Sequence, residues 1–246
     1  MKKENKLVIF GVHAVESAMR ADYVEIEELF FQSKKVNKKI QFIQNVAKDS
    51  KIATNFKSRK DLDILSDFGN HQGIVALAKK LKQNTSLKDL LQSVSESSLI
   101  LILDQIQDPH NLGACLRTAE CAGVDAILLP KDGSCKLNDT VRKVASGAAE
   151  IIQVFYVPNL VQAMESLKEH GYWIYGAAEN AENSLYQCEM TGRIAMVMGS
   201  EGRGMRRLTQ QKCDFLINIP MQGQIPNLNV SVATGIFLFE VLRQSI

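Results

Sequence analysis

The sequence predicts an α/β protein of two domains, the second built on a parallel sheet. Residues 1–80 alternate between short apolar runs and amphipathic segments, and a second alternation extends over residues 98–246. The first run of the second part, LILILD at 99–104, is continuously apolar, which is typical of a strand buried on both faces of a parallel sheet. The polar stretch 81–97 predicts a linker between the two domains.

The first domain reads as a small α/β sandwich. Its apolar runs predict strands at 6–12, 26–31, 52–56 and 73–80, with helices over 13–22, 33–50 and 60–68. No combination of residues in this domain suggests a catalytic site.

Charge is distributed unevenly along the chain. Residues 1–90 contain 17 Lys and Arg against 11 Asp and Glu, whereas the remainder contains 12 against 16. Lysines in the first turns of the helix over 33–50 oppose the helix dipole, a cost that bound phosphates or solvent salt could offset. We therefore expect the first domain to bind a polyanion, the alternative being an ordinary solvated lysine-rich surface. The candidate residues are Lys34, Lys35, Lys38, Lys39, Lys57, Arg59 and Lys60.

The second domain is predicted to be a doubly wound parallel sheet. Strands are expected at 99–104, 126–130, 151–157, 173–178, 194–200 and 215–220, and helices over 112–123, 140–150, 160–171, 205–212 and from residue 230 onward. In such sheets ligands bind at the carboxyl ends of the strands.

Composition narrows the class of protein. No run reaches the roughly 18 apolar residues of a membrane span, and the N-terminus lacks a signal-peptide pattern, so we expect a cytoplasmic protein. The five cysteines are scattered and never spaced as CxxC, which predicts reduced and mostly buried thiols. The four histidines lie far apart, and no metal site is expected.

Three loops that follow strand ends contain the polar residues of a candidate site. In DPHNLGACLR (108–117), Asp108 and Pro109 suit a helix start. Asn111 and Arg117 lie six residues apart, so they need the bend of the entry turn to face one site. The glycines of MGSEGRGM (198–205) have the spacing GxxGxG, which argues against a GxGxxG dinucleotide fingerprint. The third loop opens IPMQGQIPNLNVSVATGIFLFE (219–240) and leads into an apolar helix.

These three motifs resemble those of the SPOUT superfamily of knotted methyltransferases, in its TrmH (SpoU) branch of RNA ribose 2'-O-methyltransferases. The likeness covers the whole second domain. The first domain, from FGVHAVESAM to HQGIVA, resembles the substrate-binding domain of the same branch, which is related to ribosomal protein L30e. The stretches DPHNLGACLR, EGRGMRRLT and NVSVATGIFLFE most resemble those of family members that methylate a guanosine of 23S rRNA.

The resemblance implies a C-terminal trefoil knot, S-adenosylmethionine as the methyl donor, and a homodimer whose active site forms across the interface. It implies that cofactor contacts come from Gly199, Gly202, Ile219, Met221 and Leu228. Arg117 is implied as the catalytic base, although an arginine normally stays protonated, so a cationic role at a phosphate and the developing alkoxide remains open.

Three further residues receive roles from the same resemblance. Asn111 is expected to hold the ribose or Arg117, Glu201 to position Arg117 or the nucleoside, and Asn229 to shape the knot loop. Simple helix-end functions are the alternatives for all three. The sequence departs from the family at Asn227, where serine is usual, and this puts any hydroxyl-dependent role there in doubt.

The implied function is methylation of a guanosine 2'-hydroxyl in 23S rRNA, either free or in a large-subunit precursor. A tRNA ribose methyltransferase is the alternative within the same class. A non-catalytic rRNA-binding assembly factor and a nucleotide-dependent oxidoreductase are the alternatives from other classes, the latter disfavoured by the missing GxGxxG.

Overall fold

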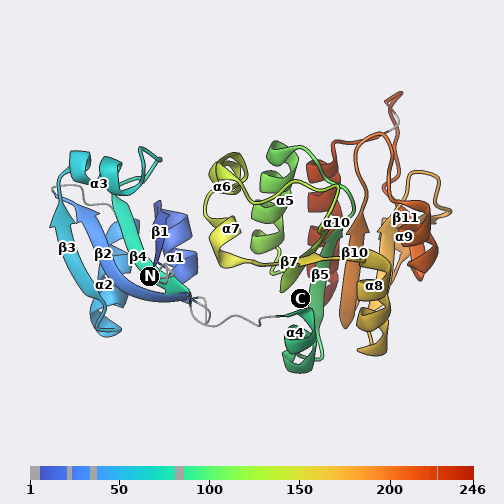
Figure 1. Cartoon of the computed structure of the whole chain (residues 1–246), viewed down its shortest axis with the longest axis horizontal. Coiled ribbons are helices and arrows are strands. Elements are labelled where there is room, and N and C mark those ends of the chain that lie inside the picture. Colours follow the sequence, from blue (N-terminus) through green and yellow to red (C-terminus); the bar gives the residue numbers. More distant parts are fainter. Residues whose placement is uncertain (1–5, 21–23, 34–37, 81–85, 226) are drawn as a thin grey trace. The chain divides into compact units, whose positions relative to one another are not determined.

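Two separate sheets organise the chain (Figure 1). The computed structural model describes residues 6–20, 24–33, 38–80, 86–225 and 227–246. One unit, the N-terminal unit, consists of Met1–Gln83 and Ser146–Ile151, and the other, the C-terminal unit, consists of Asn84–Ala145 and Ile152–Ile246.

The N-terminal unit is built on a four-stranded mixed sheet with the strand order β1-β4-β2-β3. Strand β4 pairs antiparallel with β1 and β2, while β3 pairs parallel with β2 at the edge. Its elements are β1 (Lys6–Phe10), α1 (Val12–Arg20), β2 (Val24–Gln32), α2 (Lys38–Asp49), β3 (Ala53–Lys57), α3 (Arg59–Leu65) and β4 (Ile74–Lys80). The predicted alternation of strands and helices in this part of the chain is therefore present.

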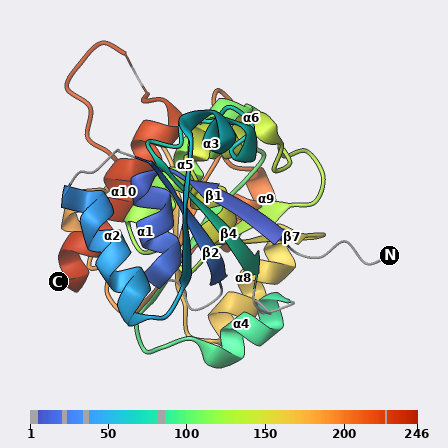
Figure 2. The same ribbon diagram turned by 90° about the vertical axis from the view of Figure 1, so that its left-hand side faces the viewer.

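Helices cover both faces of this sheet, as Figure 2 allows the reader to follow. Helices α1 and α2 share one apolar cluster with the strands, which includes Val15, Ile40 and Ile43. On the other face, Leu62 of α3 packs with Phe30 and Val75. The start of α3 is fixed by a capping box, in which Ser58 and Asp61 bond to each other's backbone N–H groups.

The C-terminal unit contains a seven-stranded sheet with the order β7-β6-β5-β10-β8-β11-β9, and every strand pair in it is parallel. The strands are β5 (Ser98–Leu103), β6 (Ala126–Pro130), β7 (Gln153–Val157), β8 (Trp173–Ala177), β9 (Asn183–Ser184), β10 (Arg193–Met198) and β11 (Phe215–Asn218). The helices of this unit are α4 (Leu87–Ser93), α5 (Pro109–Cys121), α6 (Asp139–Ala145), α8 (Leu160–Glu169), η1 (Leu185–Gln187), α9 (Arg207–Lys212) and α10 (Val230–Ser245). Helix α7 (Ala148–Ile151) belongs to the N-terminal unit.

The sheet is buried as its sequence predicts. Strands β5 and β6 are buried at every position, because helices cover both faces. One face packs against α8 and α4, through residues such as Met164, Leu167 and Leu90. Helix α4 lies within the stretch 81–97 that was predicted as a linker, and its Leu90 and Leu91 belong to this core.

Two local features differ from the sequence prediction. The helix predicted over 140–150 is interrupted, because Ser146 (φ 52°) and Gly147 (φ 98°) adopt left-handed conformations between α6 and α7. The short elements β9 and η1 were not predicted, since two or three residues are too few to show a period.

The chain crosses back over the sheet near its C-terminus. Strand β11 lies beyond β8, yet the following helix α10 packs against α5 and β10, on the other side of β8 (Figure 1). A hydrogen bond between Thr234 Oγ1 and Cys115 Sγ (3.6 Å) joins α10 to α5. The parallel α/β fold class predicted for this part of the chain is confirmed. The C-terminal knot stays a prediction.

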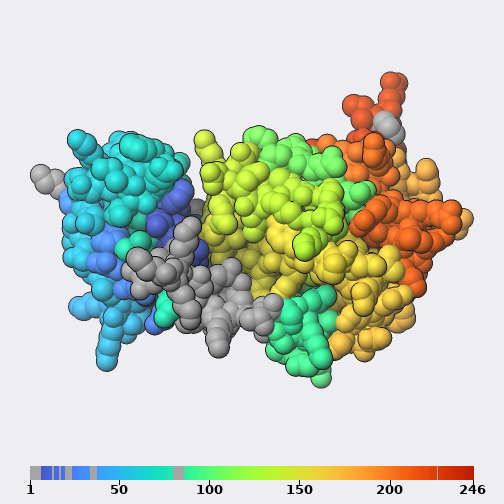
Figure 3. All heavy atoms as spheres, viewed as in Figure 1, coloured from blue at the N-terminus to red at the C-terminus, as the bar shows by residue number. Residues whose placement is uncertain are grey.

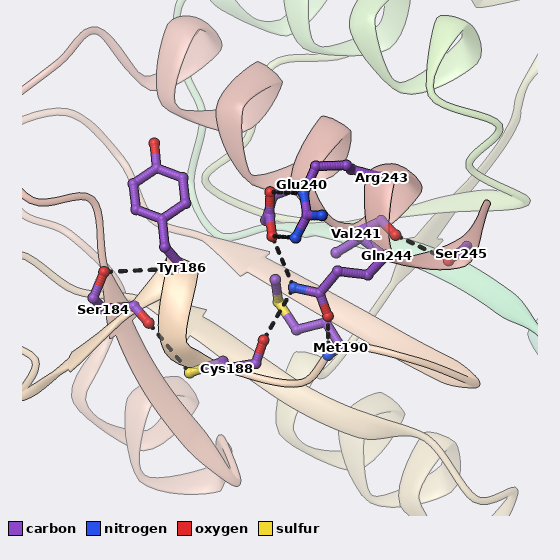
Figure 4. A network of polar contacts seen from close by, with 9 residues as sticks. All are labelled: Ser184, Tyr186, Cys188, Met190, Glu240, Val241, Arg243, Gln244 and Ser245. Carbon is purple, nitrogen blue, oxygen red and sulfur yellow. Dashed lines mark hydrogen bonds and ion pairs between the residues drawn. The ribbon is translucent and has the colours of Figure 1, made fainter.

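The end of α10 is fastened to the segment around η1 by a polar network (Figure 4). Gln244 donates from Nε2 to the Cys188 carbonyl (3.0 Å) and accepts at Oε1 from the Met190 backbone N–H (2.7 Å). The buried Glu240 carboxylate accepts from Arg243 in a two-point ion pair (2.7 and 2.9 Å) and from Gln244 (2.8 Å).

This network predicts a pH-dependent contribution to stability. The hydrogen bonds from Arg243 and Gln244 lower the pKa of Glu240 from 4.5 to about 2. A carboxylate with a lowered pKa stabilises the fold above its unfolded-state pKa, and this contribution is lost as the pH falls through the folded-state value. In urea titrations, we expect the stability difference between wild type and Glu240→Gln to shrink from about pH 6 to about pH 2. A difference that stays constant over this range would contradict the prediction.

The cysteines are unpaired, and burial raises the pKa of Cys115 to about 11 and that of Cys213 to about 12. The expectation that most thiols are buried is wrong, since only Cys115 is fully buried and Cys121 is exposed. None of the helices in the described part of the chain combines the length and apolar character that crossing a membrane requires.

Candidate functional site

Loops after three strands meet at one edge of the large sheet. Strands β5, β10 and β11 are parallel members of this sheet, so their carboxyl ends lie on the same side. The loops after β10 and β11 line a cavity of about 800 Å³, the donor cavity, which is within the usual size range of ligand pockets. All five residues predicted to contact the cofactor line it: Gly199, Gly202, Ile219, Met221 and Leu228. Residues 219–225, red-orange in Figure 3, protrude from the surface of the C-terminal unit.

The loop after β10 forms a tight hairpin that only glycine permits. Ser200 and Gly204 exchange two backbone hydrogen bonds (3.0 and 2.9 Å), and Gly202 and Gly204 have φ values of 78° and 65°. A Cβ on Gly199 would lie 2.1 Å from the Gly204 carbonyl carbon and 2.2 Å from the Met205 nitrogen. The backbone at Gly199 is therefore packed directly against the far arm of the hairpin.

Asp104 holds the end of this hairpin and was not singled out by the sequence analysis. Its fully buried carboxylate accepts from the Arg206 backbone N–H (2.9 Å) and from Arg206 Nε (2.8 Å). These bonds tie the hairpin to the end of β5. The available signal was the single acid that ends the apolar strand LILILD, at the carboxyl edge where sites form.

Three of the four predicted catalytic residues form one hydrogen-bonded group. Asn229 Nδ2 donates to Asn111 Oδ1 (3.0 Å) and to Glu201 Oε1 (2.5 Å). Asn229 also caps α10, because its Oδ1 accepts from the Ser231 backbone N–H (2.9 Å). Glu201 additionally accepts from the Val230 N–H (3.3 Å). Asn229 and Glu201 therefore make the helix-end contacts that were their alternatives, whereas Asp108 rather than Asn111 caps α5. The catalytic roles of all three residues stay predictions.

This arrangement leaves two polar atoms available for a ligand. Asn111 Nδ2 and Glu201 Oε2 bond to no described residue, while their partner atoms fix both side chains. One is a donor and the other an acceptor, which suits the recognition of a ribose hydroxyl.

A second cavity of about 400 Å³, the side cavity, adjoins the donor cavity. The two share Ser200, Glu201, Arg203 and Val230 in their walls. Asn111 lines only the side cavity, and Asn229 lines only the donor cavity. The hydrogen bond between these asparagines therefore lies at the boundary of the two cavities.

Arg117 does not join this group within one chain. It is exposed on α5, it lines neither cavity, and no described residue forms a hydrogen bond or ion pair with it. Both Asn111 and Arg117 lie within the continuous helix α5, so no bend of the chain separates them. Six residues of helix separate the two side chains by about 120° around the axis, so the expected bend does not bring them together.

The basic residues of the N-terminal unit lie on three different elements. Lys38 and Lys39 start α2 and are exposed, and Arg59 and Lys60 are exposed at the start of α3. Lys57 ends β3 with its Nζ 5.0 Å from the centroid of the Phe30 ring. Lys34 and Lys35 lie outside the described residues. Their roles in RNA binding remain predictions.

Two further observations complete the site. Asn227, at the position where the family has serine, is exposed and lines the donor cavity. Among the described residues, no group of three or more His, Cys, Asp or Glu side chains is placed to hold a metal ion.

Comparison with known proteins gives two family matches. Residues 98–239 match the SpoU rRNA Methylase family, and residues 8–84 match the domain described as RNA 2'-O ribose methyltransferase substrate binding. The chain belongs to the SpoU rRNA methylase family.

Full-length relatives of this SpoU family member are close in sequence. The chain is 46% identical over 239 residues to the 23S rRNA (guanosine-2'-O-)-methyltransferase RlmB of Escherichia coli K12, covering 96% of this chain and 98% of the relative. It is 44% identical over 238 residues to the protein of the same name from Pseudomonas aeruginosa, covering 96% of both chains.

Two solved structures of methyltransferases share the fold. The methyltransferase AviRb from Streptomyces viridochromogenes, in complex with the cofactor AdoMet, aligns with a TM-score of 0.69 at 17% identity, over 98% of this chain and 90% of that one. An RNA 2'-O ribose methyltransferase aligns with a TM-score of 0.72 at 24% identity, over 98% and 89% of the two chains. At these identities the likeness establishes the SpoU fold, including the N-terminal unit.

Proposed function

We propose that this protein transfers a methyl group from S-adenosylmethionine to the 2'-hydroxyl of a guanosine in 23S rRNA. The observation that supports this most directly is the 46% identity, over nearly the full length of both chains, to a relative named for that reaction. The same relatives disfavour a tRNA substrate, and a family match over residues 98–239 makes an oxidoreductase untenable.

The donor cavity fits the cofactor. Its volume of about 800 Å³ suits a molecule with an adenine ring, a ribose and an amino-acid tail. Apolar side chains of Ile219, Met221 and Leu228 offer contacts for the ring, and Gly199 lines the same cavity from the hairpin after β10. When bound, S-adenosylmethionine supplies an electrophilic methyl group on a sulfonium.

The chemistry requires alignment more than it requires a strong acid or base. Attack by the 2'-oxygen on the methyl carbon is an in-line displacement, in which the carbon–sulfur bond breaks and the hydroxyl loses its proton. Asn111 and Glu201, held by Asn229 at the boundary of the two cavities, are proposed to orient the ribose. Arg117 is proposed either to accept the hydroxyl proton or to remain cationic and stabilise the developing alkoxide.

The exposed position of Arg117 favours a site shared between two chains. Helix α10 next to it also exposes apolar side chains, with Val232 51% and Phe239 47% exposed. A homodimer that covers this surface would remove apolar area from water and could deliver Arg117 to the boundary of the two cavities in the partner. We propose that the active enzyme is such a dimer.

The N-terminal unit is proposed to grip folded rRNA, mainly through phosphates and shape. Its match to a substrate-binding domain of RNA 2'-O ribose methyltransferases supports this role, as do the exposed cations at the starts of α2 and α3. We propose that its partner is 23S rRNA or a precursor of the large subunit, and that it acts in the cytoplasm.

The proposal is tested by mapping ribose methylation in all stable RNAs of cells with and without the gene. We expect one 2'-O-methylguanosine of 23S rRNA to disappear and to return with the wild-type gene but not with Arg117→Ala. Loss of a tRNA position with every 23S site retained would overturn the rRNA assignment. An unchanged methylation map would support a non-catalytic assembly factor.

A further inference from the structure

The side cavity is a polar compartment that opens from the donor cavity. Its wall is formed by Gln105, Ile106, Gln107, Asp108, Asn111, Ser200, Glu201, Arg203 and Val230. Four of these residues also line the donor cavity. A nucleotide whose ribose lies at the shared wall can therefore present its 2'-hydroxyl to the donor cavity and place its base in the side cavity.

Asp108 has one carboxylate oxygen committed to the fold and one that is not. Its Oδ1 accepts from the His110 backbone N–H (2.8 Å) and so caps α5. Its Oδ2 bonds to no described residue, and the side chain lies on the exposed wall of the side cavity. The capping bond fixes the orientation of the carboxylate, so the second oxygen is a preorganised acceptor.

Gln105 and Gln107 add uncommitted amide groups to the same wall. No described residue hydrogen-bonds to either side chain. Gln105 is held at φ 65°, a left-handed conformation that is uncommon for a residue other than glycine and is found more often at functional sites. These amides can donate to a carbonyl oxygen of a bound base.

We propose that the side cavity holds the guanine base of the target nucleotide, and that Asp108 reads guanine through its free carboxylate oxygen. This rests on the proposed methyltransferase function and extends it to base selection. Guanine presents two adjacent donors, N1–H and N2–H, on its Watson–Crick edge, which no other standard base does. A fixed carboxylate oxygen can accept hydrogen bonds from these donors. Adenine and cytosine instead present a ring nitrogen that is itself an acceptor, and two acceptors placed opposite each other repel.

Two substitutions separate base reading from helix capping, because asparagine and serine cap helices about as well as aspartate. Asp108→Asn replaces the free acceptor with an amide donor, and Asp108→Ser removes it. We expect kcat/KM on the guanosine substrate to fall by about 10- to 100-fold, more in the asparagine variant because its donor opposes the guanine donors. Asp139→Asn is the matched control, since Asp139 is an exposed acid that lines neither cavity.

The substrates are an RNA fragment containing the guanosine that the wild-type enzyme methylates, and the same fragment with inosine, which lacks the N2 amino group, at that position. Wild type and Asp139→Asn are expected to prefer guanosine by about 10-fold or more. Both Asp108 variants are expected to lose this preference, so that the ratio approaches about 1, while their S-adenosylmethionine Kd stays within about twofold of wild type.

The outcomes distinguish this inference from the proposed function. Equal methylation of guanosine and inosine by the wild type would overturn base reading by Asp108 but leave methyl transfer intact. Variants that lose activity on both substrates with an unchanged ratio would show that Asp108 acts only in the fold. Failure of the wild type to methylate any RNA would overturn the proposed function itself.

Discussion

Gly199→Ala is expected to weaken binding of S-adenosylmethionine by about 100-fold or more without unfolding the protein. The added Cβ would lie 2.1 Å from the Gly204 carbonyl carbon, and both arms of the hairpin are backbone, so neither can move aside as a flexible side chain would. Overpacking of this kind costs about 3 kcal/mol, which corresponds to about a 100-fold or larger increase in the cofactor Kd if the hairpin opens into the donor cavity. Isothermal titration calorimetry measures this directly.

Gly223→Ala is the matched control for this substitution. Gly223 lies in the loop after β11, and a Cβ there would meet no atom within 4 Å. We expect its cofactor Kd to match that of wild type. A Gly199→Ala protein that binds the cofactor within about threefold of wild type would contradict binding of the cofactor against this hairpin.

Backbone-level features of the donor cavity could be predicted from the sequence because they depend on local patterns. A buried strand followed by closely spaced glycines indicates a tight turn at the carboxyl edge of a sheet, and parallel topology brings such turns together. The assignment of Gly199, Gly202 and Leu228 to the cofactor came from the resemblance to the methyltransferase family, because closely spaced glycines alone indicate only a turn. The same local logic identified Asp108 as a helix cap.

Contacts between distant segments could not be predicted in this way. The bond between Asp104 and Arg206 joins residues 102 positions apart, and no period or turn signal records such a pairing. The side cavity also escaped prediction, since its wall combines the end of β5 with the hairpin after β10. The separation of Arg117 from Asn111 could have been predicted from their spacing alone. Two helical residues six positions apart do not lie on the same face of the helix.

Arg117→Ala is expected to lower the rate of methyl transfer by about 10²- to 10⁴-fold, the usual effect of removing a general base or a charge-stabilising donor. Binding of S-adenosylmethionine should be unaffected, because Arg117 does not line the donor cavity. Arg117→Lys distinguishes the two roles through the pH dependence of the single-turnover rate. If the Arg117→Lys enzyme has wild-type rates at every pH, both proposed roles of Arg117 are wrong.

Mixing two inactive variants tests whether Arg117 acts in the partner's site. In a heterodimer of Arg117→Ala with Gly199→Ala, the first subunit keeps an intact donor cavity and receives Arg117 from the second. Such a dimer contains one complete site if Arg117 acts across the interface and none if it acts within its own chain. After subunit exchange at equal amounts, half of the dimers are mixed, so we expect about a quarter of wild-type activity. Activity no greater than that of either variant alone would show that each chain uses its own Arg117, and would require α5 to rearrange when RNA binds.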